Sequence, residues 1–217
     1  MISQRYSGIC DNYSDYTYHI LGCGAIGSAT ATQLVRMGAT HIKLYDMDTV
    51  GEENIGVSMF SLDHVKKDKT EALKLICKSI NSDVYVETFH ETFRSYEPEG
   101  KDIVVLGFDS MEARLTAVKI ICKIHKPDYI IDGRMGAEHY QQYVISSPTV
   151  SKYMKSWYSD EDGSDEPCNA KATSYCSSMS GSFISNSIRK ILTNQPYHQE
   201  MSFHFPTMQL QLKKLKK

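Results

Sequence analysis

The 217-residue sequence lacks several features that each point to a particular class of protein. No apolar run approaches the ~20 residues that a membrane-spanning helix needs, so we expect no membrane contact. Basic charge is not in excess, because 24 Lys and Arg stand against 26 Asp and Glu, and we therefore expect no nucleic-acid partner. The first residues lack the pattern of a signal peptide, so we expect none there.

Paired cysteines are also missing. The six cysteines are scattered along the chain: Cys10, Cys23, Cys77, Cys122, Cys168 and Cys176. A structural zinc site or a disulfide framework needs closely spaced cysteines, such as C-x-x-C pairs. We therefore expect no structural zinc, and we expect a reducing, cytoplasmic location.

A glycine-rich turn lies near the start of the chain, between an apolar run and a helical pattern. It has the G-x-G-x-x-G spacing, Gly22-Cys23-Gly24-Ala25-Ile26-Gly27. In this setting Gly22 allows a tight turn, Gly24 lets backbone N–H groups approach phosphate, and Gly27 lets the helix pack closely on the sheet. The helix N-terminus favours the phosphate charge. The pattern predicts a nucleotide site; the alternative is a turn that only packs a helix on a sheet.

Acidic and basic residues follow at places where strands and helices are expected to begin or end. Asp46 ends the next apolar strand, where a carboxylate can accept both ribose hydroxyls. Asp48, Asn54, Lys69 and Asp109 are expected at the same edge. A lysine neutralises phosphate charge and a strand-end acid can hold Mg²⁺, so the set favours a nucleoside triphosphate. A dehydrogenase would need only the ribose acid, and an NAD-linked oxidoreductase is a third interpretation.

Strands alternate with helices over the first part of the chain. The expected strands are 17–21, 41–46, 84–88, 102–106 and 129–132, and the expected helices are 25–37, 68–80 and 112–125. This alternation predicts an α/β protein with a Rossmann-like, doubly wound, mostly parallel sheet. Ligands bind beyond the carboxyl ends of such strands, which places the glycine turn, Asp46, Asp109 and Asp132 along one edge.

The alternation ends after Asp132, and an antiparallel extension is expected. We expect a loop over 47–66, a turn over 133–136, an antiparallel strand over 140–145, an acidic crossover loop over 157–166, a small-residue helix over 172–192, an edge strand over 201–205 and a solvated lysine tail over 213–217. One domain is expected over 1–217. It comprises an arm (1–16), a nucleotide-binding core (17–135) and a remainder holding the crossover loop, long helix and last strand (136–217).

The order of these motifs resembles the ThiF, MoeB and ubiquitin-activating adenylyltransferase family. The resemblance is carried by Gly22–Gly27, Arg36-Met37-Gly38, Asp46-Met47-Asp48-Thr49-Val50, Asn54, Lys69-Thr70-Glu71-Ala72 and Asp109. It implies ATP and Mg²⁺ binding, and adenylation of the C-terminal carboxylate of a ubiquitin-like or sulfur-carrier protein that ends in glycine. It also implies a homodimer, which the small-residue helix weakly supports.

The resemblance assigns roles position by position. Asp46 would bind ribose, Asn54 and Lys69 the phosphates, and Asp109 the Mg²⁺ ion. The alternative for Lys69 is a solvated lysine at a helix start, and for Asp109 an N-cap of the following helix.

Cys168 lies about where the family carries a thioester cysteine. Its surroundings, Glu166-Pro167-Cys168-Asn169-Ala170-Lys171-Ala172, resemble the C-T-A-R-A stretch of compact phage or mobile-element members. A helix N-terminus and a nearby lysine favour the thiolate. An ordinary loop cysteine is the alternative, and Cys176 is expected to be packed inside the helix.

Two stretches differ from the family pattern. The family has Arg-Gln shortly after the asparagine, where this chain has Val57-Ser58, and its R-Y-x-R-Q pattern reads Arg5-Tyr6-Ser7-Gly8-Ile9 here. Two phosphate-facing guanidiniums are thus missing, with Arg114 and Arg134 as candidates to replace them. A catalytically impaired, partner-binding relative is therefore the second interpretation.

Overall fold

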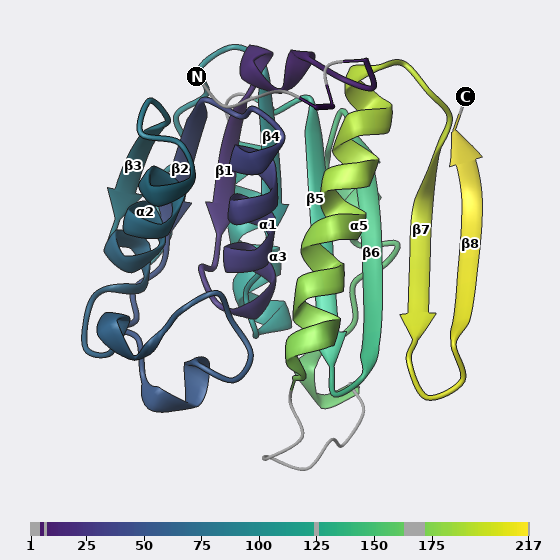
Figure 1. Cartoon of the computed structure of the whole chain (residues 1–217). Coiled ribbons are helices and arrows are strands. Elements are labelled where there is room, and N and C mark those ends of the chain that lie inside the picture. The colour runs from purple at the N-terminus through teal and green to yellow at the C-terminus, as the bar shows by residue number, and fades with distance from the viewer. Residues whose placement is uncertain (1–4, 7, 124–125, 163–171, 217) are drawn as a thin grey trace.

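The computed structural model describes residues 5–6, 8–123, 126–162 and 172–216, and their strands form one sheet. The sheet has the order β3-β2-β1-β4-β5-β6-β7-β8 (Figure 1). The strands are β1 (Thr17–Leu21), β2 (His41–Tyr45), β3 (Tyr85–Phe89), β4 (Asp102–Leu106), β5 (Tyr129–Gly136), β6 (His139–Ser146), β7 (Tyr197–His204) and β8 (Gln209–Lys216). The first five strands pair in parallel and the last three pair antiparallel, which confirms the predicted fold class.

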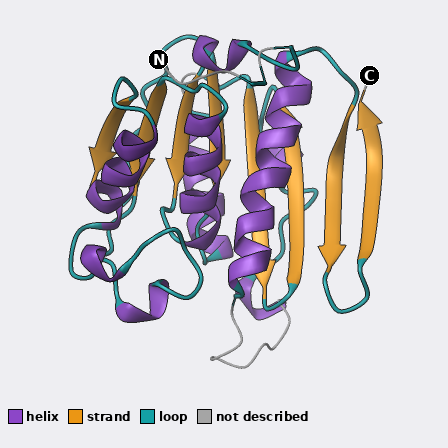
Figure 2. Cartoon of the chain, in the orientation of Figure 1, coloured by secondary structure: helices purple, strands orange, loops and turns teal. Residues whose placement is uncertain are grey.

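Helices cover the two faces of this sheet (Figure 2). They are α1 (Ala25–Arg36), α2 (Lys69–Ile80), α3 (Met111–Ile121), α4 (Val150–Tyr153) and α5 (Ser174–Leu192). Helices α1, α2 and α5 lie on one face and α3 lies on the other (Figure 1). Among the described residues, no helix is long and apolar enough to cross a membrane.

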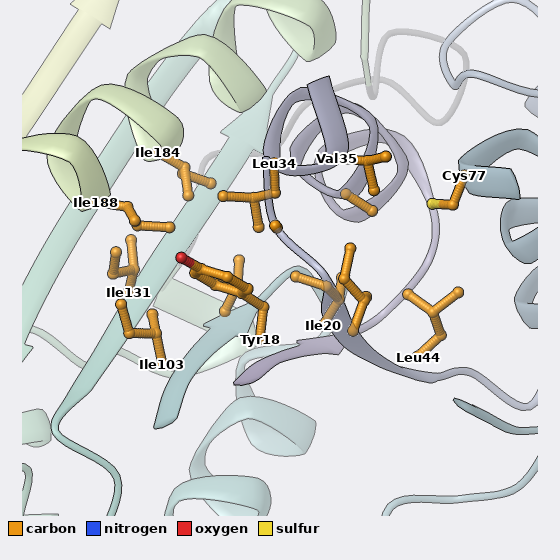
Figure 3. Packing of buried hydrophobic residues seen from close by; sticks show 14 of the residues in the cluster. Tyr18, Ile20, Leu34, Val35, Leu44, Cys77, Ile103, Ile131, Ile184 and Ile188 are labelled. Carbon is orange, nitrogen blue, oxygen red and sulfur yellow. The ribbon is translucent and has the colours of Figure 1, made fainter. Parts of the chain in front are cut away.

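The larger hydrophobic core lies between the sheet and helices α1, α2 and α5 (Figure 3). Tyr18 and Ile20 of β1 alternate with residues that face α3, and both are fully buried. Leu34 of α1 and Ile184 of α5 meet them from the helix layer. Each such apolar side chain contributes roughly 1.5–3 kcal/mol when fully buried, so the core fixes α1 and the glycine turn that precedes it.

The small residues of α5 pack against α1 within the same chain. A Cβ atom added at Gly181 would lie 2.6 Å from the carbonyl carbon of Ala29, so only glycine allows this approach. Ser177 Oγ donates a hydrogen bond to the Ala25 carbonyl at 2.9 Å. This face of α5 is therefore buried inside the chain, and it gives no support to a dimer interface.

Three expectations for the last part of the chain are wrong. Residues 133–136 are not a turn but the end of β5, which pairs with β6 up to Gly136 opposite His139. Strand β7 is not the sheet edge, because β8 covers it. The lysines that were expected to be a tail belong to β8 as far as Lys216, where alternating leucines pair with β7, as Leu212 does with Met201.

Candidate functional site

The glycine turn joins β1 to α1 at the carboxyl end of the parallel strands. Gly22 has φ +90°, and an added Cβ would lie 2.7 Å from the Gly107 carbonyl carbon. A Cβ at Gly27 would lie 1.8 Å from the Gly22 carbonyl oxygen. Among the described residues, nothing lies within 4 Å of the Cβ position at Gly24, and no side-chain hydrogen bond caps α1. Gly22 and Gly27 are thus required by packing. Gly24 instead leaves open space at the N-terminus of α1, which a bound phosphate requires.

Asp46 follows β2 and is tied to the glycine turn. Its Oδ2 accepts a hydrogen bond from the Cys23 N–H at 2.7 Å, and its Oδ1 accepts one from the Asp48 N–H at 2.9 Å. Burial raises the pKa of Asp46, against the lowering effect of these two bonds. Each oxygen keeps a lone pair, so the carboxylate can still accept ribose hydroxyls.

Lys69 begins α2 and lies among acidic groups. Its Nζ is 2.8 Å from Oδ2 of Asp48, and its side chain is only 12% exposed. Burial lowers the pKa of Lys69, but the bond to Asp48 and the charges of Asp46, Asp48 and Asp109 outweigh this effect and raise it. The lysine is therefore fixed and charged, and it is not a freely solvated side chain.

Asp109 lies in the turn between β4 and α3, is exposed, and makes no hydrogen bond or ion pair with another described residue. It is not the N-cap of α3, because Ser110 holds that position and its side chain accepts a hydrogen bond from the Ala113 N–H at 3.2 Å. The Asp109 carboxylate, whose charge acts on Lys69, is thus free to bind a cation.

Asn54 lies in the loop between β2 and α2, which contains two short 3₁₀ turns. Its Oδ1 accepts a hydrogen bond from the Gly51 N–H at 2.9 Å, and its carbonyl accepts one from Ser58 Oγ at 2.6 Å. Its amide nitrogen makes no hydrogen bond to another described residue, so this is the atom left for a ligand.

These residues fit a nucleoside triphosphate with Mg²⁺. The open Gly24 position and the uncapped α1 N-terminus suit phosphate, and Asp109 offers an unpaired carboxylate. No three His, Cys, Asp or Glu side chains of the described chain group closely enough to hold a metal by themselves. Mg²⁺ would therefore take most of its ligands from phosphate and water, as it commonly does.

The two arginines considered as replacements are held elsewhere. Arg114 and Arg134 are 3% and 4% exposed, and both form ion pairs with the fully buried Asp132. Neither guanidinium is free to reach a phosphate, so this expectation is wrong. Burying charged side chains requires paired partners, and the sequence did not show that Asp132 supplies them.

The cysteines of the described chain are all free. Cys176 is fully buried in α5, and burial raises the pKa of its thiol to about 11, so it is unsuited to be a nucleophile. Cys168 lies outside the described residues.

A further group at this edge was not found from the sequence. Asp160 accepts hydrogen bonds from the Met111 N–H at 2.6 Å and from Ser110 Oγ at 3.0 Å, at the start of α3. Trp157 Nε1 donates to the Met111 carbonyl at 2.9 Å. The segment after α4 therefore contacts the turn that carries Asp109, although about 50 residues separate them in the sequence.

Comparisons with known proteins identify relatives of this chain. A stretch of 128 residues is 36% identical to ubiquitin-like modifier-activating enzyme 5 of Oryza sativa subsp. japonica and covers 50% of this chain and 30% of that protein. The Arabidopsis thaliana enzyme of the same name is 35% identical over 138 residues, or 53% of this chain and 32% of that protein. The chain thus spans about a third of the length of these curated relatives.

Solved structures share the fold. E. coli MccB with ATP superposes with a TM-score of 0.74 at 18% identity, over 95% of this chain and 66% of that chain. PaaA gives 0.73 at 19% identity, with the same coverage. A sequence model of the ThiF family matches residues 7–217. The chain therefore belongs to the ThiF family.

Proposed function

We propose that the chain is an ATP-dependent adenylyltransferase that activates the C-terminal carboxylate of a ubiquitin-like or sulfur-carrier protein ending in glycine. The observation that carries this proposal is the position of Lys69 among Asp46, Asp48 and Asp109, beside the open glycine turn. A dinucleotide site needs a ribose acid but neither a fixed lysine nor a second free acid. Oxidoreductase chemistry therefore leaves Lys69 and Asp109 without a role.

In the proposed reaction, a carboxylate oxygen of the protein substrate attacks the α-phosphorus of ATP. The bond from that phosphorus to the oxygen bridging to the β-phosphate breaks, and pyrophosphate leaves with the electron pair. Backbone N–H groups after Gly24 would bind phosphate, Asp46 the ribose, and Lys69 and the amide of Asn54 the negative oxygens. Asp109 would hold Mg²⁺, which when bound neutralises charge on the phosphates.

The relatives support the choice of substrate. Ubiquitin-like modifier-activating enzyme 5 is named for activating a ubiquitin-like modifier, and E. coli MccB has been solved with ATP. We propose that the present chain likewise binds ATP and activates a ubiquitin-like protein. We also propose that it is cytoplasmic and forms a homodimer.

A second step is proposed for Cys168. Its thiolate would attack the acyl carbonyl of the adenylate, so that a thioester forms and AMP leaves. A Cys168→Ser variant should form the adenylate but no reducible conjugate on a non-reducing gel, whereas a conjugate that survives this change removes the role.

Exchange of labelled pyrophosphate into ATP tests the first step. Exchange should occur with a ubiquitin-like protein that ends in Gly-Gly and should disappear when the same protein carries a C-terminal amide, because the nucleophile is then missing. Equal exchange with both proteins, or none with either, contradicts the proposal.

A second candidate function is partner binding without catalysis. It is favoured by Val57 and Ser58 at the positions of the family's Arg-Gln, and by the burial of Arg114 and Arg134 with Asp132. Binding of the ubiquitin-like protein in calorimetry, combined with a lack of exchange, would select this function.

A further inference from the structure

Asp132 lies at the centre of a buried cluster, in the middle of β5 and opposite Leu106, the last residue of β4. Its Oδ1 accepts a hydrogen bond from Arg114 of α3, and its Oδ2 accepts bonds from Nη2 and Nε of Arg134 at 2.6 and 2.9 Å. One carboxylate thus joins two guanidiniums, and all three residues are less than 5% exposed.

Arg114 holds the backbone that leads to Asp109. Its Nη1 donates to the Leu106 carbonyl at 3.2 Å, and its Nη2 donates to the Phe108 carbonyl. These carbonyls belong to the last residue of β4 and to the residue directly before Asp109. Arg114 therefore fixes the turn from its amino-terminal side.

Arg134 holds the segment after α4. Its Nη1 donates to the Ser156 carbonyl at 2.7 Å, and its guanidinium lies over the rings of Tyr143 and Tyr158, 4.4 and 5.1 Å from their centroids. The neighbouring Trp157 bonds to the Met111 carbonyl at the start of α3. The same turn is thus held from its carboxyl-terminal side.

We propose that Arg114, Asp132 and Arg134 form a clamp whose function is to position Asp109. Because Asp109 makes no hydrogen bond or ion pair with another described residue, the place of its carboxylate beside Lys69 depends on where the backbone of its turn is held. Arg114 holds one side of that turn directly with charge-assisted hydrogen bonds, and Arg134 holds the other side indirectly, through Ser156 and its neighbour Trp157. A buried ion pair adds little stability compared with apolar residues of the same volume, so positioning is the better explanation for this cluster.

The catalytic readout of this inference rests on the proposed function. In Arg134→Lys, which keeps the charge but loses the planar fork, kcat for pyrophosphate exchange should fall on the order of 10- to 100-fold, because small displacements in a site have effects of that size. KM for ATP should stay within about twofold, because among the described residues no hydrogen bond joins the three clamp side chains to Asp46 or to residues 22–27. The matched control is Arg189→Lys on α5, whose side chain bonds, within the described part of the chain, to Asn186 and Gln195.

A structural readout separates the clamp from the proposed function. Trp157 is the single tryptophan of the chain, so its emission reports this segment alone. In Arg134→Lys the emission should shift to the red, and amide hydrogen exchange over residues 106–112 should speed up at least about tenfold. If the wild-type chain catalyses no exchange, the adenylation proposal fails and these two measurements still decide the clamp.

Two outcomes overturn the clamp. One is an Arg134→Lys variant with wild-type kcat, and the other is unchanged amide exchange over residues 106–112 in that variant.

Trp157→Phe supplies a second test that leaves the buried charges in place. It removes the bond to Met111 and part of the ring's packing against buried apolar residues, and we expect a smaller increase in amide exchange over the same residues and a kcat decrease of about two- to fivefold. Amide exchange at the wild-type rate in this variant also contradicts the proposal.

Discussion

Lys69 is bound to Asp48 through both its side chain and its backbone. Its Nζ lies 2.8 Å from Oδ2 of Asp48, and its N–H donates to the Asp48 carbonyl at 3.0 Å. The first residue of α2 is thereby joined to the segment that follows β2. This double contact places one ammonium beside the acidic strand ends before any ligand binds, so little reorganisation is needed on binding.

Nucleotide binding should depend on Mg²⁺. The three carboxylates near Lys69 outnumber its single positive charge, so free ATP meets net negative charge. In calorimetry at constant ionic strength, replacing Mg²⁺ with EDTA should weaken ATP binding at least about tenfold, and Asp109→Asn should reduce that difference. Equal affinity with and without Mg²⁺ would show that the ion has no place in the site.

Replacing Lys69 by methionine should remove catalysis with little loss of stability. We expect pyrophosphate exchange to fall about 10²- to 10³-fold, because one fixed charge donor at a reacting phosphate has effects of this size. Lys67→Met is the matched control, since Lys67 is exposed and its ammonium pairs with no described residue. Similar rates for the two variants would mean that Lys69 is structural.

The glycines of the turn should separate folding from binding. A Cβ at Gly27 collides with backbone, so Gly27→Ala should lower the free energy of unfolding by about 3 kcal/mol or more. Gly24→Ala meets open space and should change stability by less than about 1 kcal/mol, while weakening ATP binding about tenfold or more. Thermal unfolding and calorimetry measure the two effects, and unchanged ATP affinity in Gly24→Ala would place the phosphates elsewhere.

Asp102 should make the fold sensitive to acid. It is 1% exposed and accepts hydrogen bonds from Tyr96 at 3.1 Å and from the Glu99 N–H at 3.0 Å, with His19 Nε2 at 3.4 Å. Burial raises the pKa of Asp102, but these partners outweigh burial and lower it. Its stabilising effect is therefore complete above the ordinary carboxyl pKa of about 3.9 and is lost as pH falls through the lower folded value.

Asp102→Asn should lower the free energy of unfolding by about 1–3 kcal/mol at pH 7. Below about pH 4 the variant should lose stability less steeply than the wild type, because the titrating group is gone. Urea unfolding at a series of pH values measures both effects, with the exposed Asp63→Asn as control. Parallel curves for Asp102→Asn and the wild type would show that Asp102 does not titrate on unfolding.

Local patterns were sufficient to predict the parallel half of the fold. The glycine spacing and the apolar runs around it predicted the bounds of β1 correctly and those of α1 to within one residue. Each element there has a distinct periodicity and a clear turn signal. The contact between Lys69 and Asp48 follows from the parallel topology, which brings strand ends and helix starts to one edge.

The antiparallel half was harder to predict. Gly133 and Gly136 suggested a turn, but β6 pairs along the whole of β5 and overrides the local glycine signal. The clamp depends on contacts between distant segments, such as Arg114 with Asp132, which no local pattern indicates. Asp132 and Arg134 lie two residues apart on one face of β5, but the predicted strand ended at Asp132 and put Arg134 in a turn.

The central claim is that this edge of the sheet adenylates a carboxylate with the help of Asp109. The most direct measurement is pyrophosphate exchange by the wild-type chain and by Asp109→Ala, side by side, with a ubiquitin-like protein ending in Gly-Gly. The account predicts exchange in the wild type and a rate at least about 100-fold lower in the variant, while thermal stability is unchanged because Asp109 is exposed and makes no hydrogen bond or ion pair with another described residue. Full exchange in Asp109→Ala, or none in the wild type, would contradict it.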